Sequence, residues 1–216
     1  DGVGELWWQA IEDIISRQQA IAMTVDGETD YVDTRTTSQK QAAFDTLYWQ
    51  MRKMPEDERI ALLRKFAAAY GYDLDQQCRD LIMDWPELRH FAGESLCTIG
   101  AHTVHHYELA KLPLDQARNE ISKSAEILHA QFGQRPAHFS YPLGGPLSAG
   151  PREFALARES GFSSAVTTRP GGLYKRHAQD PFALPRVSLN GYFQSRRFVD
   201  VFATGAIFSL MGKLTG

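Results

Sequence analysis

Short strand-like runs alternate with helical stretches between residues 95 and 189, and this alternation constrains the fold more than any other feature. The strand candidates are "SLCTIGAH", "AHFSYPLGG", "FSSAVTT" and "FALPRVSL". Pro113 opens a helix that Gly133 closes, and Pro151 opens another that stops at Gly161. Strand, helix and strand in repeated order are typical of parallel β/α units. We therefore predict an α/β fold whose functional residues gather at the carboxyl ends of its strands.

A mainly helical block precedes this region. Residues 5–17 carry apolar side chains at helical spacing, and an Asp26-Gly27 turn between alternating residues predicts a short hairpin. From Ser38, an expected N-cap, the pattern stays helical to about residue 90. The expected parts are a helix and hairpin over residues 1–37, a helical insertion over 38–94, a β/α portion over 95–191 and a helical C-terminal tail over 192–216.

Composition and charge exclude several classes of protein. Of the 216 residues, 43% are hydrophobic and 23% charged, which leaves enough apolar material for a core. The net charge of -3 argues against a nucleic-acid partner. The late apolar stretch "FVDVFATGAIFSLMG" is too short to span a bilayer and contains Asp200. Cys78 and Cys97 are expected to be buried free thiols, which leaves the compartment open, with the cytoplasm slightly favoured.

Three of the seven histidines lie close together in "GAHTVHH". His102 and His106 are four residues apart, so on a helical turn their Cβ atoms would lie roughly 5–6 Å apart on one face. Such a pair can bind one divalent ion, and neutral imidazole suits zinc, cobalt, nickel or iron better than magnesium. The alternative is a polar patch between a strand and a helix. A hydrolytic metal usually has three protein ligands, and no carboxylate of this chain stands at an obvious strand end facing the pair.

The segments "IGAHTVHH", "RPAHFSYPLG" and "GFSSAVTT" together resemble the polysaccharide deacetylase family of carbohydrate esterases, which includes chitooligosaccharide deacetylases. The family motif His-[Ser/Thr]-x-x-His matches His102, Thr103 and His106. The resemblance implies that both histidines bind a metal, commonly zinc, and that Thr103 supports their loop through a hydrogen bond. It also implies a partial or distorted (β/α) barrel that carries an inserted helical subdomain.

A second family motif, Phe-Arg-Pro-Pro-Tyr-Gly, resembles the segment Phe-Ser-Tyr-Pro-Leu-Gly at residues 139–144. Leu143 stands where the family has Tyr, and its backbone N–H is expected in the oxyanion hole whatever the side chain. Ser140 replaces the family's Arg, which orients the catalytic Asp. Arg186, at another strand end, could supply a replacement guanidinium, or could form a structural ion pair instead.

Two further residues of this segment are expected to contact substrate. They are Tyr141, which could stack on a sugar ring or pack in the core instead, and Pro142. Two family motifs do not appear: Thr-Phe-Asp-Asp, with the catalytic base and third metal ligand, and a late Leu-x-His, with the general acid. We therefore expect the chain to be the C-terminal portion of a larger protein whose third metal ligand is an upstream Asp.

The resemblance predicts the function of the full-length protein. It would be a metal-dependent hydrolase that removes N-acetyl groups from an amino-sugar oligo- or polysaccharide, such as a chitooligosaccharide, through a metal-bound water. The isolated 216 residues are expected to be inactive. The alternatives are a hydrolase of another non-peptide C–N or acetyl ester bond, and a catalytically degenerate relative that binds carbohydrate or a protein partner. Strand edges left exposed by an incomplete barrel would favour a homodimer.

Overall fold

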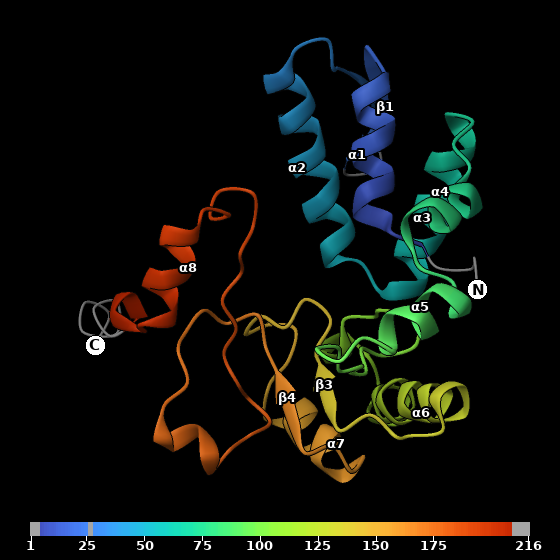
Figure 1. Cartoon of the computed structure of the whole chain (residues 1–216). Helices are drawn as coiled ribbons and strands as arrows, with labels where there is room; N and C mark the ends of the chain where they lie inside the picture. The colour runs from blue at the N-terminus through green and yellow to red at the C-terminus, as the bar shows by residue number, and fades with distance from the viewer. Residues whose placement is uncertain (1–4, 26–27, 209–216) are drawn as a thin grey trace. The chain divides into compact units, whose positions relative to one another are not determined.

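The computed structural model describes residues 5–25 and 28–208, which fall into two compact units, Asp1–Phe91 and Ala92–Gly216 (Figure 1). The prediction of a mixed α/β chain is confirmed, since both helices and paired strands are present. No helix of the described ranges is both long enough and apolar enough to cross a membrane. The finer division into four parts stays a prediction.

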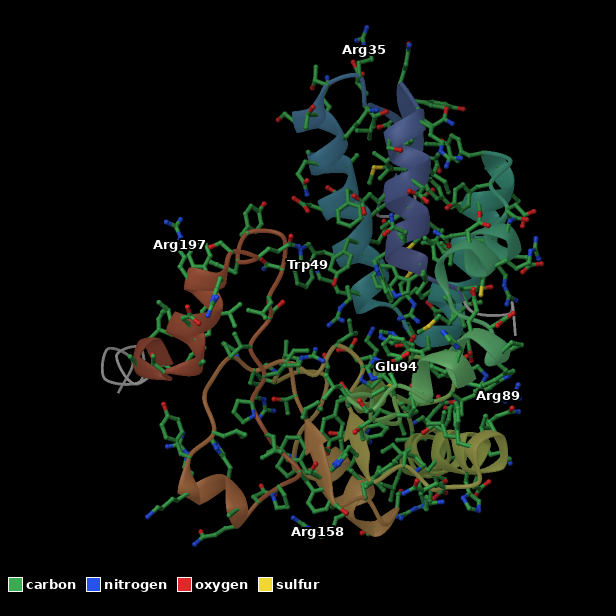
Figure 2. The ribbon with its side chains drawn as sticks, in the orientation of Figure 1. Arg35, Trp49, Arg89, Glu94, Arg158 and Arg197 are labelled. Carbon is green, nitrogen blue, oxygen red and sulfur yellow. The ribbon has the colours of Figure 1, made fainter. Side chains whose placement is uncertain are left out.

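In the first unit, two helices pack against the amphipathic helix α1. This helix turns one apolar stripe inward, and Trp7, Ile11 and Ile14 are buried while α2 and α3 pack against it. Trp7 stacks on Tyr48 of α2 with ring centroids 5.1 Å apart, whereas Trp49 next to it projects from the unit and is 57% exposed (Figure 2). The elements are α1 Trp7–Arg17, β1 Ala20–Val25, β2 Glu28–Asp33, α2 Thr37–Lys53, α3 Glu56–Ala69, α4 Leu74–Leu81 and α5 Trp85–Ala92.

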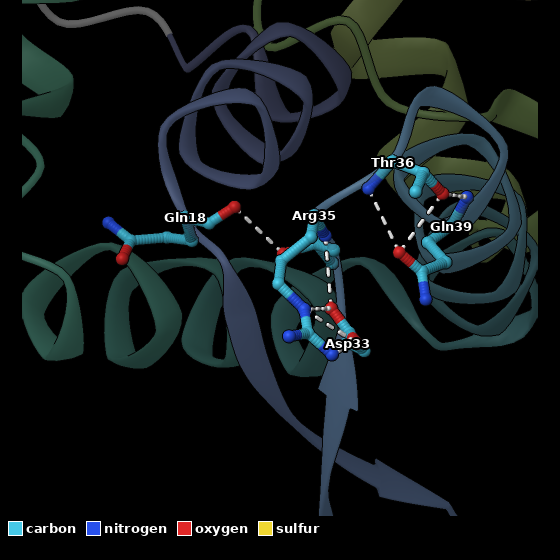
Figure 3. Close-up of polar contacts among 6 residues, drawn as sticks. Gln18, Asp33, Arg35, Thr36 and Gln39 are labelled. Atoms are coloured by element: carbon cyan, nitrogen blue, oxygen red, sulfur yellow. Dashed lines mark hydrogen bonds and ion pairs between the residues drawn. The ribbon is translucent and has the colours of Figure 1, made fainter.

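The hairpin β1–β2 is antiparallel with Val25 paired to Glu28, as the alternating pattern predicts, while its turn lies outside the described residues. The predicted cap of the next helix is wrong. Thr36, not Ser38, caps α2: its hydroxyl accepts from the Gln39 backbone N–H at 3.3 Å, and the Gln39 side chain accepts from the Thr36 N–H at 2.9 Å (Figure 3). This reciprocal pair satisfies two donors that a helix start leaves open, which Ser38 inside the first turn could not do.

The second unit is built on short parallel strands. β3 (His138–Ser140) pairs with β4 (Ser164–Val166) in parallel, and the two lie side by side (Figure 1). Single bridges from Ala101 to Phe139 and from Val166 to Leu184 extend this sheet on each side. The predicted parallel arrangement is confirmed, but two of the four expected strands pair through one residue each. The described residues therefore form no closed barrel.

The helices beside this sheet begin and end where Pro and Gly residues predict. α6 (Leu114–Phe132) follows Pro113 and ends at Gly133, whose φ of 70° is the left-handed conformation that glycine adopts readily. α7 (Pro151–Glu159) packs against α6 and β4. Ile121, Phe139 and Leu156 are among the buried residues of this core. The remaining elements are two short 3₁₀ helices, η1 (Leu109–Lys111) and η2 (Lys175–Ala178), and α8 (Arg196–Ala203), while residues 209–216 of the expected C-terminal helix lie outside the described range.

Candidate functional site

The two candidate metal ligands lie close together on a loop, so the predicted helical turn is wrong. His102 follows the bridge residue Ala101 directly, and neither it nor His106 belongs to a helix. Thr103 and His106 have φ values of 65° and 57°, a left-handed conformation that side-chain-bearing residues rarely adopt. These two reversals fold the loop back on itself. The imidazole centroids are 4.8 Å apart, with the ring planes inclined by 68°.

One hydrogen bond fixes the form of the His102 ring. Its Nδ1 lies 2.6 Å from the Ser140 carbonyl oxygen at the end of β3. Because a carbonyl can only accept, Nδ1 carries the proton and Nε2 keeps its lone pair in the neutral ring. Desolvation lowers the pKa of His102, and the nearby Arg186 guanidinium lowers it further, against the opposing effect of the Ser140 carbonyl. The lowered pKa favours the neutral ring, which is the form that binds a metal.

Thr103 supports this loop from inside. Its hydroxyl oxygen accepts a hydrogen bond from the His106 backbone N–H at 3.0 Å. This is the kind of contact that the resemblance implies for Thr103, although its effect on a metal stays a prediction.

A buried glutamate that the sequence analysis did not identify holds the centre of the same loop. Glu120 of α6 accepts from the backbone N–H groups of Val104 and His105, at 3.1 and 2.9 Å. Its other oxygen lies 2.6 Å from His105 Nδ1. A sequence signal did exist, because Glu120 stands between Ala117 and Ile121 on the apolar face of α6. A carboxylate in such a position needs internal partners.

The loop after β3 is held against the end of β4. Leu143 has a φ of 61°, and no hydrogen bond to its N–H is found in the described ranges. Gly144 has a φ of 54°, and its carbonyl accepts from the Thr168 N–H at 3.1 Å. A Cβ at residue 144 would lie 2.7 Å from the Thr168 nitrogen, so only glycine fits there. The Leu143 N–H is thus a fixed donor at the carboxyl end of the sheet.

Arg186 and Ser140 are neighbours in the structure. The Nη1 group of Arg186 donates to the Ser140 hydroxyl at 3.4 Å, and its backbone N–H donates to the Arg169 carbonyl at 3.0 Å. No salt bridge to Arg186 is found in the described part of the chain, so the alternative of a structural ion pair has no support there. That Arg186 takes the place of the family's Arg stays a prediction.

The expected substrate contacts lie in the interior. Tyr141 has no exposed surface, donates from its hydroxyl to the Phe182 carbonyl at 2.9 Å and packs against Phe139 and Phe154. Core packing, the alternative for this ring, is therefore what the structure shows, and a sugar could not stack on it in this conformation. Burial raises the pKa of the Tyr141 hydroxyl. Pro142 is buried as well.

The imidazoles of His102 and His106 fit part of a metal site. Two neutral imidazoles suit a borderline divalent ion such as zinc. Over residues 5–25 and 28–208, however, no three His, Cys, Asp or Glu side chains are grouped so that they could hold a metal. The pair would accordingly provide two ligands of a site that needs a third. Glu108, a carboxylate close by in the sequence, is buried and accepts from Ser148 at 2.6 Å instead.

Comparison with known proteins agrees with the motifs. The family profile described as polysaccharide deacetylase matches residues 60–154. Residues 60–154 are thus similar to a polysaccharide deacetylase domain. The match includes both histidines and the segment 139–144, and it begins within the block 38–94 that was expected to be an insertion. No curated protein matches the chain.

Several solved structures are similar in part to this chain. Deacetylase PplD of Streptococcus pyogenes, in complex with acetate, is 21% identical with a TM-score of 0.44, over 49% of this chain and 44% of that one. The putative polysaccharide deacetylase BA0330 of Bacillus anthracis is 19% identical with a TM-score of 0.47, over 58% and 38%. IcaB of Ammonifex degensii is 21% identical with a TM-score of 0.42, over 56% and 52%. The chain thus spans about half of these structures or less.

Proposed function

We propose that the full-length protein removes N-acetyl groups from an acetylated amino-sugar polysaccharide or oligosaccharide with the help of a divalent metal, zinc being the best fit. The family match supports deacetylation of polysaccharide in general. The observation that carries the metal proposal is the pair of imidazoles 4.8 Å apart, with the His102 Nδ1 bonded to Ser140 so that Nε2 is left to bind. The third ligand would come from an Asp upstream of this chain.

The metal, when bound, would supply a Lewis acid that polarises the acetamide carbonyl and acidifies water. His102 and His106 would hold it from one side. The Leu143 N–H, fixed by the packing of the adjacent Gly144 against Thr168, would donate to the carbonyl oxygen as negative charge develops there. Such a donor costs no reorganisation during the reaction, because the loop already holds it in place.

Arg186 would take over the role of the family's Arg. Its guanidinium reaches Ser140, the residue that replaces that Arg, and it carries no salt bridge within the described ranges. A forked guanidinium can hold a carboxylate in one orientation through two hydrogen bonds. In the full-length protein it would orient the upstream Asp that accepts a proton from the attacking water.

A second candidate function is binding without catalysis. The observation that favours it is the incomplete donor set, since the described residues offer two metal ligands rather than three. A degenerate relative would keep the histidine pair and still bind carbohydrate. The two candidates differ in whether the full-length protein releases acetate.

The test is metal analysis and acetate release from a chitooligosaccharide, with full-length protein and two variants. We expect about one zinc per protein and acetate release, both lost in His102→Ala. The exposed His129 of α6 provides the control, and His129→Ala should retain both. Zinc binding without acetate release would favour the binding-only function. Equal zinc content in His102→Ala and the wild type would contradict the site.

A further inference from the structure

Glu120 connects the body of the second unit to the loop between the two histidines. Its carboxylate is buried, with a side-chain exposure of 4%, and it belongs to α6, which packs into the core through Ala117 and Ile121. Oε2 accepts the two backbone N–H groups of Val104 and His105, and Oε1 accepts from the His105 ring. Every one of these partners lies between His102 and His106.

The loop needs such a partner because its backbone is strained at both ends. Thr103 and His106, which flank the two bonded amides, have φ values of 65° and 57°. A left-handed residue other than glycine costs about 1–2 kcal/mol and persists only where its surroundings hold it. Hydrogen bonds to a charged group are the strongest that a backbone amide can make. The Glu120 carboxylate therefore opposes the relaxation of a loop that would otherwise carry His106 away from His102.

We propose that Glu120 is a positioning residue for the metal site: by binding the amides of Val104 and His105 it holds the His106 ring beside the His102 ring. This inference rests on the proposed function, because it presupposes that the two rings bind a metal. The contacts of Glu120 that carry this inference are with the backbone of the loop, so it acts through the loop. Contacts behind the ligands of a metal typically change affinity by about 10- to 100-fold when they are removed.

Glu153 offers a matched control. It is a carboxylate of α7 with the same 4% side-chain exposure as Glu120, and it too accepts from a backbone N–H, that of Gly150 at 2.8 Å. Its partners lie away from the histidine loop. Glu153→Gln should therefore cost stability as Glu120→Gln does, without an effect on the two rings.

The first measurement is hydrogen exchange of the backbone amides, without metal, in this chain. Glu120→Gln should speed the exchange of the Val104 and His105 amides at least about 10-fold, because both donate to one oxygen of a charged carboxylate, and a neutral amide oxygen in its place is a weaker acceptor. In Glu153→Gln the two amides should exchange at the wild-type rate. Unchanged protection of both amides in Glu120→Gln would overturn the proposal.

The second measurement is the increase in Tm caused by added Zn²⁺, with His102→Ala defining the contribution of other zinc sites. This increase reports affinity separately from the stability of the metal-free protein. The zinc affinity calculated from these increases in Tm should fall about 10-fold or more in Glu120→Gln and stay unchanged in Glu153→Gln. Equal zinc-induced shifts in Glu120→Gln and the wild type would overturn the positioning role alone. A wild type that responds to zinc no more than His102→Ala would overturn both the metal site and this inference.

Discussion

The Arg186 guanidinium donates to the Ser140 hydroxyl at 3.4 Å, although 46 residues separate the two in sequence. Ser140 ends β3, and Arg186 follows the bridge between Val166 and Leu184, so parallel pairing brings both to the carboxyl edge of one sheet. The Ser140 carbonyl also accepts from His102. One residue thus contacts both the candidate metal ligand and the arginine that would orient a catalytic carboxylate.

Substitution of Arg186 by alanine should raise the pKa of His102. Desolvation and the Arg186 charge both lower this pKa in the folded protein, so Arg186→Ala removes the second effect and leaves the first. The pKa should therefore rise but stay below the ordinary value, as an NMR titration of the ring would show. A histidine whose pKa is lower in the folded than in the unfolded protein, where it is near 6.5, stabilises the fold at pH values above 6.5. This contribution to stability is lost as the pH falls through the folded pKa. In Arg186→Ala this loss should be smaller and should be complete at a higher pH.

The control for this titration is Arg158→Ala, which removes an exposed arginine of the same unit that pairs with Asp180. It should leave the His102 titration unchanged. The same upward shift in both variants would mean that net charge, rather than the position of Arg186, sets the pKa.

Glycine at position 143 should be more stabilising than alanine. Leu143 has a φ of 61°, which is strained for any residue with a Cβ. Leu143→Ala and Leu143→Gly both lose the side chain, but only the glycine variant relieves the strain. We expect Leu143→Gly to exceed Leu143→Ala by about 1 kcal/mol in the free energy of unfolding, measured in guanidinium chloride. Leu147 is 88% exposed and its φ is not positive, so there the alanine variant should be more stable than the glycine variant. The same order at both positions would argue against strain at Leu143.

A methyl group at position 144 should disrupt the loop beside it. Its Cβ would lie 2.7 Å from the Thr168 nitrogen and 3.1 Å from the Tyr141 carbonyl oxygen, both backbone atoms that cannot move alone. We expect Gly144→Ala to lower the free energy of unfolding by about 3 kcal/mol. Gly133 has a similar φ of 70° with nothing within 4 Å of a Cβ, so Gly133→Ala should cost about 1 kcal/mol. Equal losses would show that φ alone, and not the contact with Thr168, requires glycine at residue 144.

Local signals predicted the elements well because each depends on a few neighbouring residues. Pro113 and Gly133 bound α6, and the alternation on each side of Asp26 and Gly27 predicted the β1–β2 hairpin. The N-cap of α2 was misplaced by two residues, since Thr36 and Ser38 are both good caps and only the Gln39 side chain distinguishes them.

The site was less predictable because its geometry depends on contacts that are distant in sequence. The spacing of His102 and His106 suggested a helix, but the rings meet through two left-handed residues, which no periodicity reveals. Glu120 contacts residues 15 and 16 positions before it. Tyr141 followed a strand end, yet the aromatic residues of the core surround it.

The contribution of Asp33 to stability should disappear between about pH 4 and pH 2. Its carboxylate accepts from the Arg35 side chain and from the Arg35 backbone N–H, and these bonds, the side-chain ones first, lower its pKa from 3.8 to about 2 (Figure 3). A carboxyl whose pKa is lowered on folding stabilises the fold above its unfolded pKa and loses that effect as the pH falls through the folded value. Thermal unfolding of wild type and Asp33→Asn should thus give a Tm difference that is constant from pH 7 to about pH 5 and shrinks below about pH 4.

In an Arg35→Gln background, Asp33→Asn should change Tm by nearly the same small amount at every pH in that range, because the partner that lowers the pKa is gone. The pair is exposed, so its effect should also weaken as salt is added. A Tm difference that stays constant down to pH 2 in the wild-type background would show that Arg35 does not hold the Asp33 carboxylate in solution. The junction between β2 and α2 would then depend on the Thr36 cap without help from this ion pair.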